Sequence, residues 1–341
     1  MESRSEISGI GEFGLIDRIA KRFENKVPTT ITGIGDDAAV IDAGNEFILT
    51  STDMLIEGPH FNLQYVPLKH LGYKAVAVNV SDIAAMNGRP EQITISLGLS
   101  NRFSIQAVDE LYAGIHAACE SFGIDLVGGD TTSSPAGLVI SISIIGRVAK
   151  DKVAYRRTAR PNDIICVTGD LGGAYMGLQV LEREREVFLA NPNMQPDIEK
   201  YEYIVSRQLK PEARMDIIFD LAENKIVPTS MIDVSDGLAS ELLHISSQSG
   251  VGVKIFEDKL PIDAQTYETA VEMGLDPVTC ALNGGEDYEL LFTIDPSAYE
   301  KLKNHPDIHF IGHVHNEPRQ NQLITKQGNA FAIQAQGWTH F

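Results

Sequence analysis

The alternation of apolar and polar residues predicts strands in the first half of the chain. In residues 138–148, "LVISISIIGRV", Val and Ile alternate with Ser, which is the period-two pattern of a strand with one buried face. Residues 47–55, 91–99 and 124–130 are also rich in β-branched and apolar residues. These four segments are the strands that we predict before residue 150.

Helical spacing of apolar residues separates these strands. Residues 67–88 carry apolar and small residues at helical intervals and stop at Asn87-Gly88. Residues 104–123 are amphipathic, with Ser104 as the expected N-cap and Gly123 just past the end. We therefore predict two helices in this half.

The second half begins after a loop that contains proline. The segment "RPND" places the domain boundary near residues 150–160. Both halves mix helices and strands without a strict βαβ repeat, so we assign the fold class α/β (α+β), with one mixed α/β domain at 1–150 and a second at 151–341. In the second domain we expect strands at 163–170, 252–258 and 288–295, helices at 174–188 and near 213–225 and 265–274, and a polar surface loop at 189–203.

Composition describes an ordinary globular chain of 341 residues, with 43% apolar and 22% charged residues. No apolar run approaches the roughly 20 residues that span a bilayer, and the N-terminus has no apolar signal core. The three cysteines are widely spaced, which indicates buried thiols in a reducing compartment. We therefore expect a cytoplasmic protein, without a membrane partner. The net charge of −19 argues against nucleic acid as a partner.

Several familiar motifs fail in their context. Residues 9–14 match the dinucleotide fingerprint by letter but leave no room for a preceding strand, and residues 33–38 lead into more strand instead of a helix. No GxxxxGK[ST] loop is present. His309, His313 and His315 lie on a short predicted strand without ligand-type neighbours, which favours packing or surface roles over a zinc site.

Aspartates recur in small-residue and glycine-rich segments. The run Val-Ser-Asp occurs twice, within residues 79–86 and 232–242. Helix capping or a turn explains any one of these aspartates taken alone. Several of them directly follow an apolar β-like segment, which is where α/β folds place ligand-binding groups. The acidic residues in such settings are Asp36, Asp37, Asp53, Asp82, Asp130, Asp233, Asp236, Glu286 and Asp287.

If these carboxylates converge, they require cations. Two carboxylates 4 Å apart repel by about 4 kcal/mol at an effective dielectric constant near 20. Oxygen ligands without Cys or His suit hard ions, above all Mg²⁺, which bridges a few carboxylates to substrate phosphates. This chemistry leads to phosphoryl transfer, where catalysis is mostly positioning and charge neutralisation.

Four further residues are candidates for substrate contacts, each with a structural alternative. Arg156 and Arg157 can pair with a polyphosphate or simply lie in a solvated loop. His60, in "EGPHF", is an uncommon turn residue. Trp338 is the single tryptophan, and it can stack on a ring or close the edge of a core.

Taken together, the motifs resemble the thiamine-monophosphate kinase family nearly from end to end. That family belongs to the superfamily of aminoimidazole ribonucleotide synthetase, selenophosphate synthetase and a hydrogenase maturation protein. The motifs are "GEFGLI", "GIGDDAAV", "STDMLIEGPHF", "GYKAVAVNVSDIAAMNGRP", "LVGGDTT", "DVSDGLASEL", "GGEDYELLFT" and the terminal "GWTHF". The tail departs from the family at its threonine, where an acidic residue is frequent, and the role of residues 189–203 stays open.

The resemblance implies Mg²⁺-dependent transfer of a phosphoryl group from ATP to thiamine monophosphate, by direct in-line attack. It also implies a homodimer in which the N-terminal sheets of two subunits pair. The metal ligands implied are Asp37, Ser51, Thr52, Asp53, Asp82, Asp130, Asp233 and Asp236. The nucleotide contacts implied are Tyr112, Gly129, Asp130, Arg156 and Ser235, of which Asp130 and Arg156 take catalytic roles. The substrate contacts implied are His60, Glu286 and Trp338.

Rival functions within the superfamily fit less well. Selenophosphate synthetase calls for a reactive residue in an N-terminal loop, and no cysteine precedes Cys119. The hydrogenase maturation protein calls for a C-terminal cysteine, which this tail lacks. An aminoimidazole ribonucleotide synthetase-like enzyme, also using ATP and Mg²⁺, stays as the alternative. A cation-binding structural module would explain the carboxylates but not the Gly-Gly-Asp and Arg segments.

Overall fold

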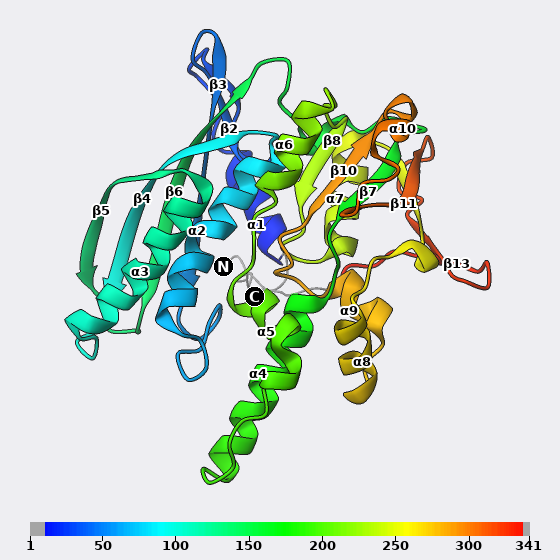
Figure 1. The fold of residues 1–341 in the computed structure, drawn as a ribbon. Coiled ribbons are helices and arrows are strands. Elements are labelled where there is room, and N and C mark those ends of the chain that lie inside the picture. The colour runs from blue at the N-terminus through cyan, green and yellow to red at the C-terminus, as the bar shows by residue number, and fades with distance from the viewer. Residues whose placement is uncertain (1–10, 337–341) are drawn as a thin grey trace, which may run out of the picture.

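The computed structural model describes residues 11–336, which form two sheets with helices packed around and between them (Figure 1). The mixed α/β fold class predicted from the sequence is confirmed. None of the helices in this part of the chain is long and apolar enough to cross a membrane.

The first sheet has six strands in the order β1-β2-β3-β6-β4-β5. All neighbours pair antiparallel except β4 and β5. Ile140, Ile142 and Ile144 of β6 are buried, while Ser143 on the opposite face is exposed, which confirms the period-two prediction. The strands are β1 (Thr30–Thr32), β2 (Ala39–Asp42), β3 (Glu46–Ile56), β4 (Arg89–Leu99), β5 (Asp125–Ser133) and β6 (Val139–Ala149).

Two helices, α2 (Leu68–Ala85) and α3 (Ile105–Phe122), cover one face of this sheet (Figure 1). Ser104 caps α3 by accepting a hydrogen bond from the Ala107 N–H, and Gly123 ends it at φ 66°, as predicted. The helices approach each other closely at Gly72, where a Cβ would lie 2.1 Å from the carbonyl oxygen of Leu111. This contact fixes α2 against α3.

The second sheet has seven strands in the order β13-β12-β9-β11-β7-β10-β8. Its neighbours pair antiparallel except β12 and β9. The strands expected at 163–170, 252–258 and 288–295 are confirmed as β7, β9 and β10 with slightly tighter bounds. The strands are β7 (Ile164–Thr168), β8 (Ser230–Asp233), β9 (Gly252–Phe256), β10 (Leu290–Ile294), β11 (Ile308–His315), β12 (Gln322–Ile324) and β13 (Ala330–Ala332).

The surface loop expected at 189–203 is only partly correct. α4 continues to Ala190, and helical turns resume at Glu199. They resume because Tyr201 and Ile204 are buried against the core and anchor this return segment. The remaining helices are α1 (Gly11–Ala20), α4 (Gly173–Ala190), α5 (Glu202–Leu209), α6 (Met215–Glu223), α7 (Leu238–Ser249), α8 (Ala264–Glu272), α9 (Pro277–Asn283), α10 (Tyr299–Leu302), and the 3-10 turns η2 (Arg156–Thr158), η3 (Glu199–Tyr201), η4 (Glu257–Lys259) and η5 (Pro296–Ala298).

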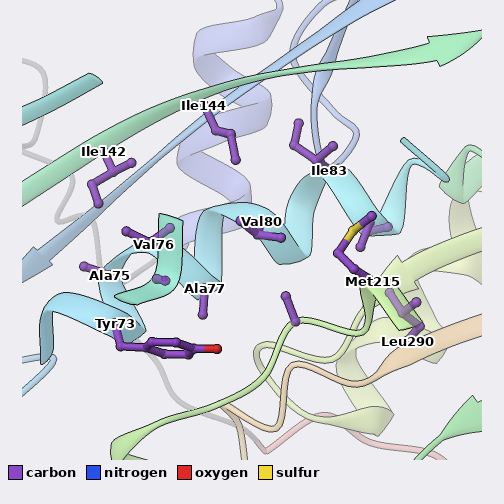
Figure 2. Packing of buried hydrophobic residues seen from close by; sticks show 14 of the residues in the cluster. Tyr73, Ala75, Val76, Ala77, Val80, Ile83, Ile142, Ile144, Met215 and Leu290 are labelled. Carbon is purple, nitrogen blue, oxygen red and sulfur yellow. The ribbon is translucent and has the colours of Figure 1, made fainter. Parts of the chain in front are cut away.

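Helix α2 lies between the two halves of the molecule. Figure 2 shows Ile142 and Ile144 of β6 on one side of the helix, with Met215 and Leu290 of the second half on another. Because α2 also contacts β8, α5 and α6, one apolar core continues from the first half into the second. All strands of the first sheet precede residue 150, and all strands of the second follow it. The division into domains 1–150 and 151–341 nevertheless stays a proposal.

Candidate active site

A cavity of about 1800 Å³ opens beside α2 and is lined by residues from both halves of the chain. Its lining is strongly acidic, so an anionic substrate could enter only with cations. The acidic residues are Asp36, Asp37, Asp53, Asp82, Glu182, Asp233, Asp236, Glu241, Asp276 and Glu286, and the lysine and arginine side chains are Lys74 and Arg156.

Three carboxylates converge at one end of this cavity. Asp37 precedes β2, Asp82 lies on α2, and Asp233 ends β8. Their nearest oxygens all lie within 4.8 Å of one another, and they form the one group of potential metal ligands found among residues 11–336. The histidines of β11 belong to no such group in that range.

Serine hydroxyls orient two of these carboxylates. The Ser51 Oγ donates to Asp82 Oδ2 at 2.5 Å, and the Ser81 Oγ donates to Asp233 Oδ2 at 2.7 Å. Asp82 sits inside α2, and α7 begins only at Leu238 with Gly237 as its N-cap. Neither Asp82 nor Asp233 is therefore the N-cap of a helix.

Two arginines of η2 neutralise the Asp36-Asp37 pair. Arg156 forms a bidentate ion pair with Asp37, with Nε 2.9 Å from Oδ2 and Nη2 bonded to Oδ1. Arg157 donates from Nη1 to Asp36 Oδ2 at 3.1 Å. The Arg156 side chain is therefore not a solvated loop residue, since it already balances part of the carboxylate cluster.

Burial and mutual repulsion raise the pKa of several cluster aspartates. The pKa of Asp233 rises to about 8, first through burial and then through Asp37. The pKa of Asp82 lies well above its ordinary value, through burial and then through Asp53 and Asp233. Burial raises the pKa of Asp53 to about 6. Asp53, Asp82 and Asp233 therefore bind a proton more tightly than exposed aspartates do, and a cation would compete with that proton.

The donor set fits Mg²⁺. It consists of carboxylate and hydroxyl oxygens, with neither sulfur nor imidazole among the clustered atoms. A divalent cation would offset both the cost of burying these carboxylates and their mutual repulsion, so the residues in place match the group that the sequence pattern predicted.

Another part of the cavity combines apolar walls with the carboxylate of Glu286. Glu286 has a φ of 66° and accepts hydrogen bonds from Gln208 Nε2 at 2.7 Å and from Lys74 Nζ, 2.9 Å away. His60 faces the same cavity and accepts a hydrogen bond from the Ile56 N–H through Nδ1 at 3.1 Å. Apolar surface comes from Tyr65, Tyr175, Leu178, Leu209 and Leu275.

Not every predicted site residue reaches this cavity. Ser235 and Asp236 line it, but Tyr112, Gly129 and Asp130 do not. Gly129 and Asp130 lie on β5, whose residues are all exposed. The Asp130 carboxylate accepts a hydrogen bond from the Thr131 N–H at 2.8 Å. Trp338 lies outside the described residues.

Thr52 is a partial exception to the predicted metal set. It lines the cavity, yet its hydroxyl donates to the carbonyl oxygen of Ile142 and accepts a hydrogen bond from the Ser143 hydroxyl at 3.1 Å, and Ser143 lies on the exposed face of the first sheet. Adjacent strand residues face opposite sides, so Asp53 points toward α2 and the Thr52 side chain points away. The structure therefore does not bring the Thr52 hydroxyl to the carboxylate cluster.

Sequence analysis missed several polar residues around the cavity. Lys74, Asn79 and Ser81 are buried on α2, and Gln208 and Glu241 are buried on α5 and α7. Charged or amide residues inside the otherwise apolar run "YKAVAVNV" were the available signal, because a buried helix position is costly for such groups unless they are paired.

Known proteins are similar to this chain along nearly its whole length. Residues 35–148 match the family described as AIR synthase related protein, N-terminal domain. The thiamine-monophosphate kinase of Bacillus subtilis is 33% identical over 97% of this chain and 99% of its own length, and that of Aquifex aeolicus is 34% identical over 97% and 98%. A solved structure named "AaThiL complexed with AMPPCP and TMP" superimposes with a TM-score of 0.84 at 32% identity, covering all of both chains. With its carboxylate cluster and full-length similarity, this chain belongs to the thiamine-monophosphate kinase family.

Proposed function

We infer that this protein phosphorylates thiamine monophosphate with ATP and Mg²⁺, giving thiamine diphosphate and ADP. The γ-phosphoryl group passes directly to a phosphate oxygen of the acceptor, and the bond to the β-phosphate breaks. The observation that carries this function is the meeting of Asp37, Asp82 and Asp233 within 4.8 Å in a cavity that also holds Glu286 and His60.

We propose that Asp37, Asp53, Asp82 and Asp233 hold the magnesium ions, with Asp236 and Ser51 beside them. Bound Mg²⁺ supplies charge neutralisation for the phosphoryl oxygens. The chain's own task is to orient the ligating carboxylates, which the Ser51 and Ser81 hydroxyls do. The metal-ligand roles of Thr52 and Asp130 rest on the family resemblance alone.

The acceptor needs no general base. A phosphate monoester is already ionised near neutral pH, so the protein has to position it and exclude water rather than remove a proton. The apolar walls at Tyr175 and Leu275 suit the thiamine rings, and Glu286 and His60 are proposed as polar contacts to the substrate. Trp338 keeps its proposed substrate role, and Ser235 and Arg156 keep their proposed contacts to the nucleotide.

We further propose a homodimer formed through the first sheet. Its edge strand β5 is fully exposed, including Leu126 and Val127, and Met54 and Ile145 are exposed on the sheet face that α2 and α3 leave uncovered. A second copy would bury these apolar side chains. It would also cover the predicted nucleotide residues Gly129 and Asp130, which lie on β5. Tyr112 on α3 keeps its proposed nucleotide contact, and Asp130 and Arg156 keep their proposed catalytic roles. The three free cysteines favour the cytoplasm as the compartment.

The test is an activity assay with the purified protein. ATP, MgCl₂ and thiamine monophosphate are incubated with the chain, and thiamine diphosphate is measured as its fluorescent thiochrome derivative. Magnesium-dependent product is expected. Absence of product while ATP still binds would refute the proposed substrate and favour the aminoimidazole alternative, which shares the matched N-terminal domain.

A further inference from the structure

Lys74 is a buried cation with no place in the magnesium chemistry described above. It lies on α2 with 4% of its surface exposed. Its Nζ lies 2.9 Å from Glu286 Oε1 and donates to the carbonyl oxygen of Gln208 at 3.2 Å. A buried ammonium group is costly unless it is paired, so these two contacts account for its presence.

Glu286 is held from several directions. Lys74 binds Oε1, Gln208 Nε2 donates to Oε2 at 2.7 Å, and the Glu286 N–H donates to the Ser235 carbonyl oxygen at 2.7 Å. Its side chain is still 28% exposed. A carboxylate offers about four acceptor sites, so acceptor capacity remains on the side that faces the cavity.

Gln208 holds the second oxygen of Glu286 from the cavity wall. Its side chain is buried, and its Nε2 atom donates to Glu286 Oε2. The Gln208 Oε1 atom is itself enclosed by protein, so the acceptor that a ligand can reach at this place is the open side of the Glu286 carboxylate. Glu286 therefore favours a ligand group that donates N–H hydrogen bonds.

Helix α2 sets the distance from Lys74 to the metal cluster. Leu71, Lys74, Val78 and Asp82 all line the cavity, which is the spacing of one helix face. Lys74 and Asp82 are eight residues apart, or ~12 Å along the axis. With the phosphate at Asp82, the far end of thiamine monophosphate points toward Lys74. That end carries the exocyclic amino group of the pyrimidine, the molecule's single N–H donor.

We propose that Lys74 is a positioning residue that, together with Gln208 Nε2, holds Glu286 as the acceptor for the amino group of thiamine monophosphate. This inference rests on the proposed function. Without the Lys74 ammonium, the Glu286 carboxylate loses its only cationic partner among the described residues and is free to turn away from the substrate. Substrate binding weakens, while the nucleotide end of the site is left as it was.

The test compares Lys74→Met with Lys69→Met, an exposed lysine on the same helix, and with Glu286→Gln. Methionine keeps most of the volume and removes the charge. For Lys74→Met we expect the KM for thiamine monophosphate to rise about tenfold or more, with kcat and the KM for ATP within about twofold. Lys69→Met is expected to match the wild type. The double variant Lys74→Met/Glu286→Gln is expected to be no worse than the poorer single variant, because both act through one carboxylate.

A second readout uses oxythiamine monophosphate, in which oxygen replaces the amino group. The wild type is expected to prefer thiamine monophosphate by about 100-fold or more in kcat/KM, and Lys74→Met is expected to lose most of that preference. If Lys74 had a purely structural role, its replacement would lower kcat/KM for both substrates by the same factor. Should Lys74→Met fold poorly, the preference is measured with Gln208→Ala, where the same loss is expected.

Three results would overturn the inference: unchanged kinetics in Lys74→Met, a loss confined to kcat and the KM for ATP, or full multiplication of the two single effects in the double variant. Each of these results counts against the inference only if the wild-type protein phosphorylates thiamine monophosphate. A wild type without that activity would refute the proposed function instead, so the two failures are distinguishable.

Discussion

Ser81 on α2 donates a hydrogen bond to Asp233 at the end of β8, with the Oγ 2.7 Å from Oδ2. This bond joins the two Val-Ser-Asp runs of the chain, one from each half. The first run contributes both a ligand, Asp82, and the hydroxyl that orients the ligand of the second run. The recurrence of the motif in the sequence therefore reflects a single site.

Replacing Ser81 with alanine tests the role of its hydrogen bond to Asp233. The variant leaves a buried oxygen of Asp233 without its donor, which costs about 1–2 kcal/mol. We expect the free energy of unfolding of the metal-free protein to fall by that amount and the Mg²⁺ concentration for half-maximal activity to rise several-fold. Urea denaturation and a Mg²⁺ titration of the activity measure the two effects. An unchanged Mg²⁺ requirement would show that the bond has no role in orienting the ligand.

Replacing Asp82 or Asp233 with asparagine separates function from stability. Both carboxylates have raised pKa values, so an uncharged amide relieves repulsion in the metal-free protein. We expect turnover to drop below detection while the melting temperature in EDTA stays equal or rises. Asp151→Asn, at an exposed position, is the control that keeps full activity. Unfolding of either cluster variant in EDTA would instead assign the aspartate a structural role.

The stability of the metal-free protein is expected to depend on pH through Asp233. Its pKa is raised from 3.8 to about 8 on folding, so the folded state binds the proton more tightly than the unfolded state. The stability that this proton provides is fully present below pH ~4 and is lost as the pH rises toward 8, on the order of a few kcal/mol. Chemical denaturation in EDTA between pH 5 and 9 measures it.

The Asp233→Asn variant is the matched comparison for that experiment. It carries no titrating group at this position, so its stability relative to the wild type is expected to grow with pH up to about 8. A constant difference across the range would contradict the raised pKa. Added Mg²⁺ is expected to stabilise the wild type more at pH 8 than at pH 6, because the cation competes with the proton.

Much of the site was accessible from the sequence because its acids carry a local signature. Asp37, Asp82 and Asp233 each stand in a small-residue segment, and all three meet in the structure. The alternation of side chains along a strand also predicts that the Thr52 hydroxyl points away from Asp53. The family resemblance nevertheless implied both residues as metal ligands, and the structure shows the Thr52 hydroxyl bonded elsewhere. Local pattern thus identifies the ligands, and strand alternation decides which side chains can reach them.

Contacts between residues that are distant in sequence could not be predicted in this way. Lys74 and Glu286 are 212 positions apart by number, and nothing local to either indicates that they pair. The same holds for Gly129, where a Cβ would lie 2.0 Å from the Ile95 carbonyl oxygen. Because Gly129 of "VGGD" pairs with Ile95 of β4, there is no room for a side chain at this position of β5. Sequence alone could not separate that requirement from a nucleotide contact.

The two arginines of η2 are expected to differ sharply. Arg156→Ala leaves the buried Asp37 without its bidentate partner, so we expect a loss of about 3 kcal/mol in the metal-free protein, partly recovered by Mg²⁺, and at least a hundredfold loss of kcat/KM for ATP. Arg157→Ala removes a half-exposed side chain that packs on Tyr155 and pairs with Asp36. It is expected to cost under about 1 kcal/mol and to leave turnover within twofold. Equal losses in both variants would contradict the assignment of Arg156 to the site.

The proposed dimer is tested at the exposed edge of the first sheet. Leu126 and Val127 on β5 are 42% and 58% exposed in the single chain. If a second copy covers them, aspartate at either position introduces repulsion and unmatched charge into the interface. We expect light scattering to give twice the chain mass for the wild type and the single mass for Leu126→Asp, with activity lost in parallel. Phe188→Asp, at a position 42% exposed on α4, is the matched control and is expected to remain dimeric and active. A monomeric and fully active wild type would refute the dimer, and Asp130 would then have no enclosed surface in which to act.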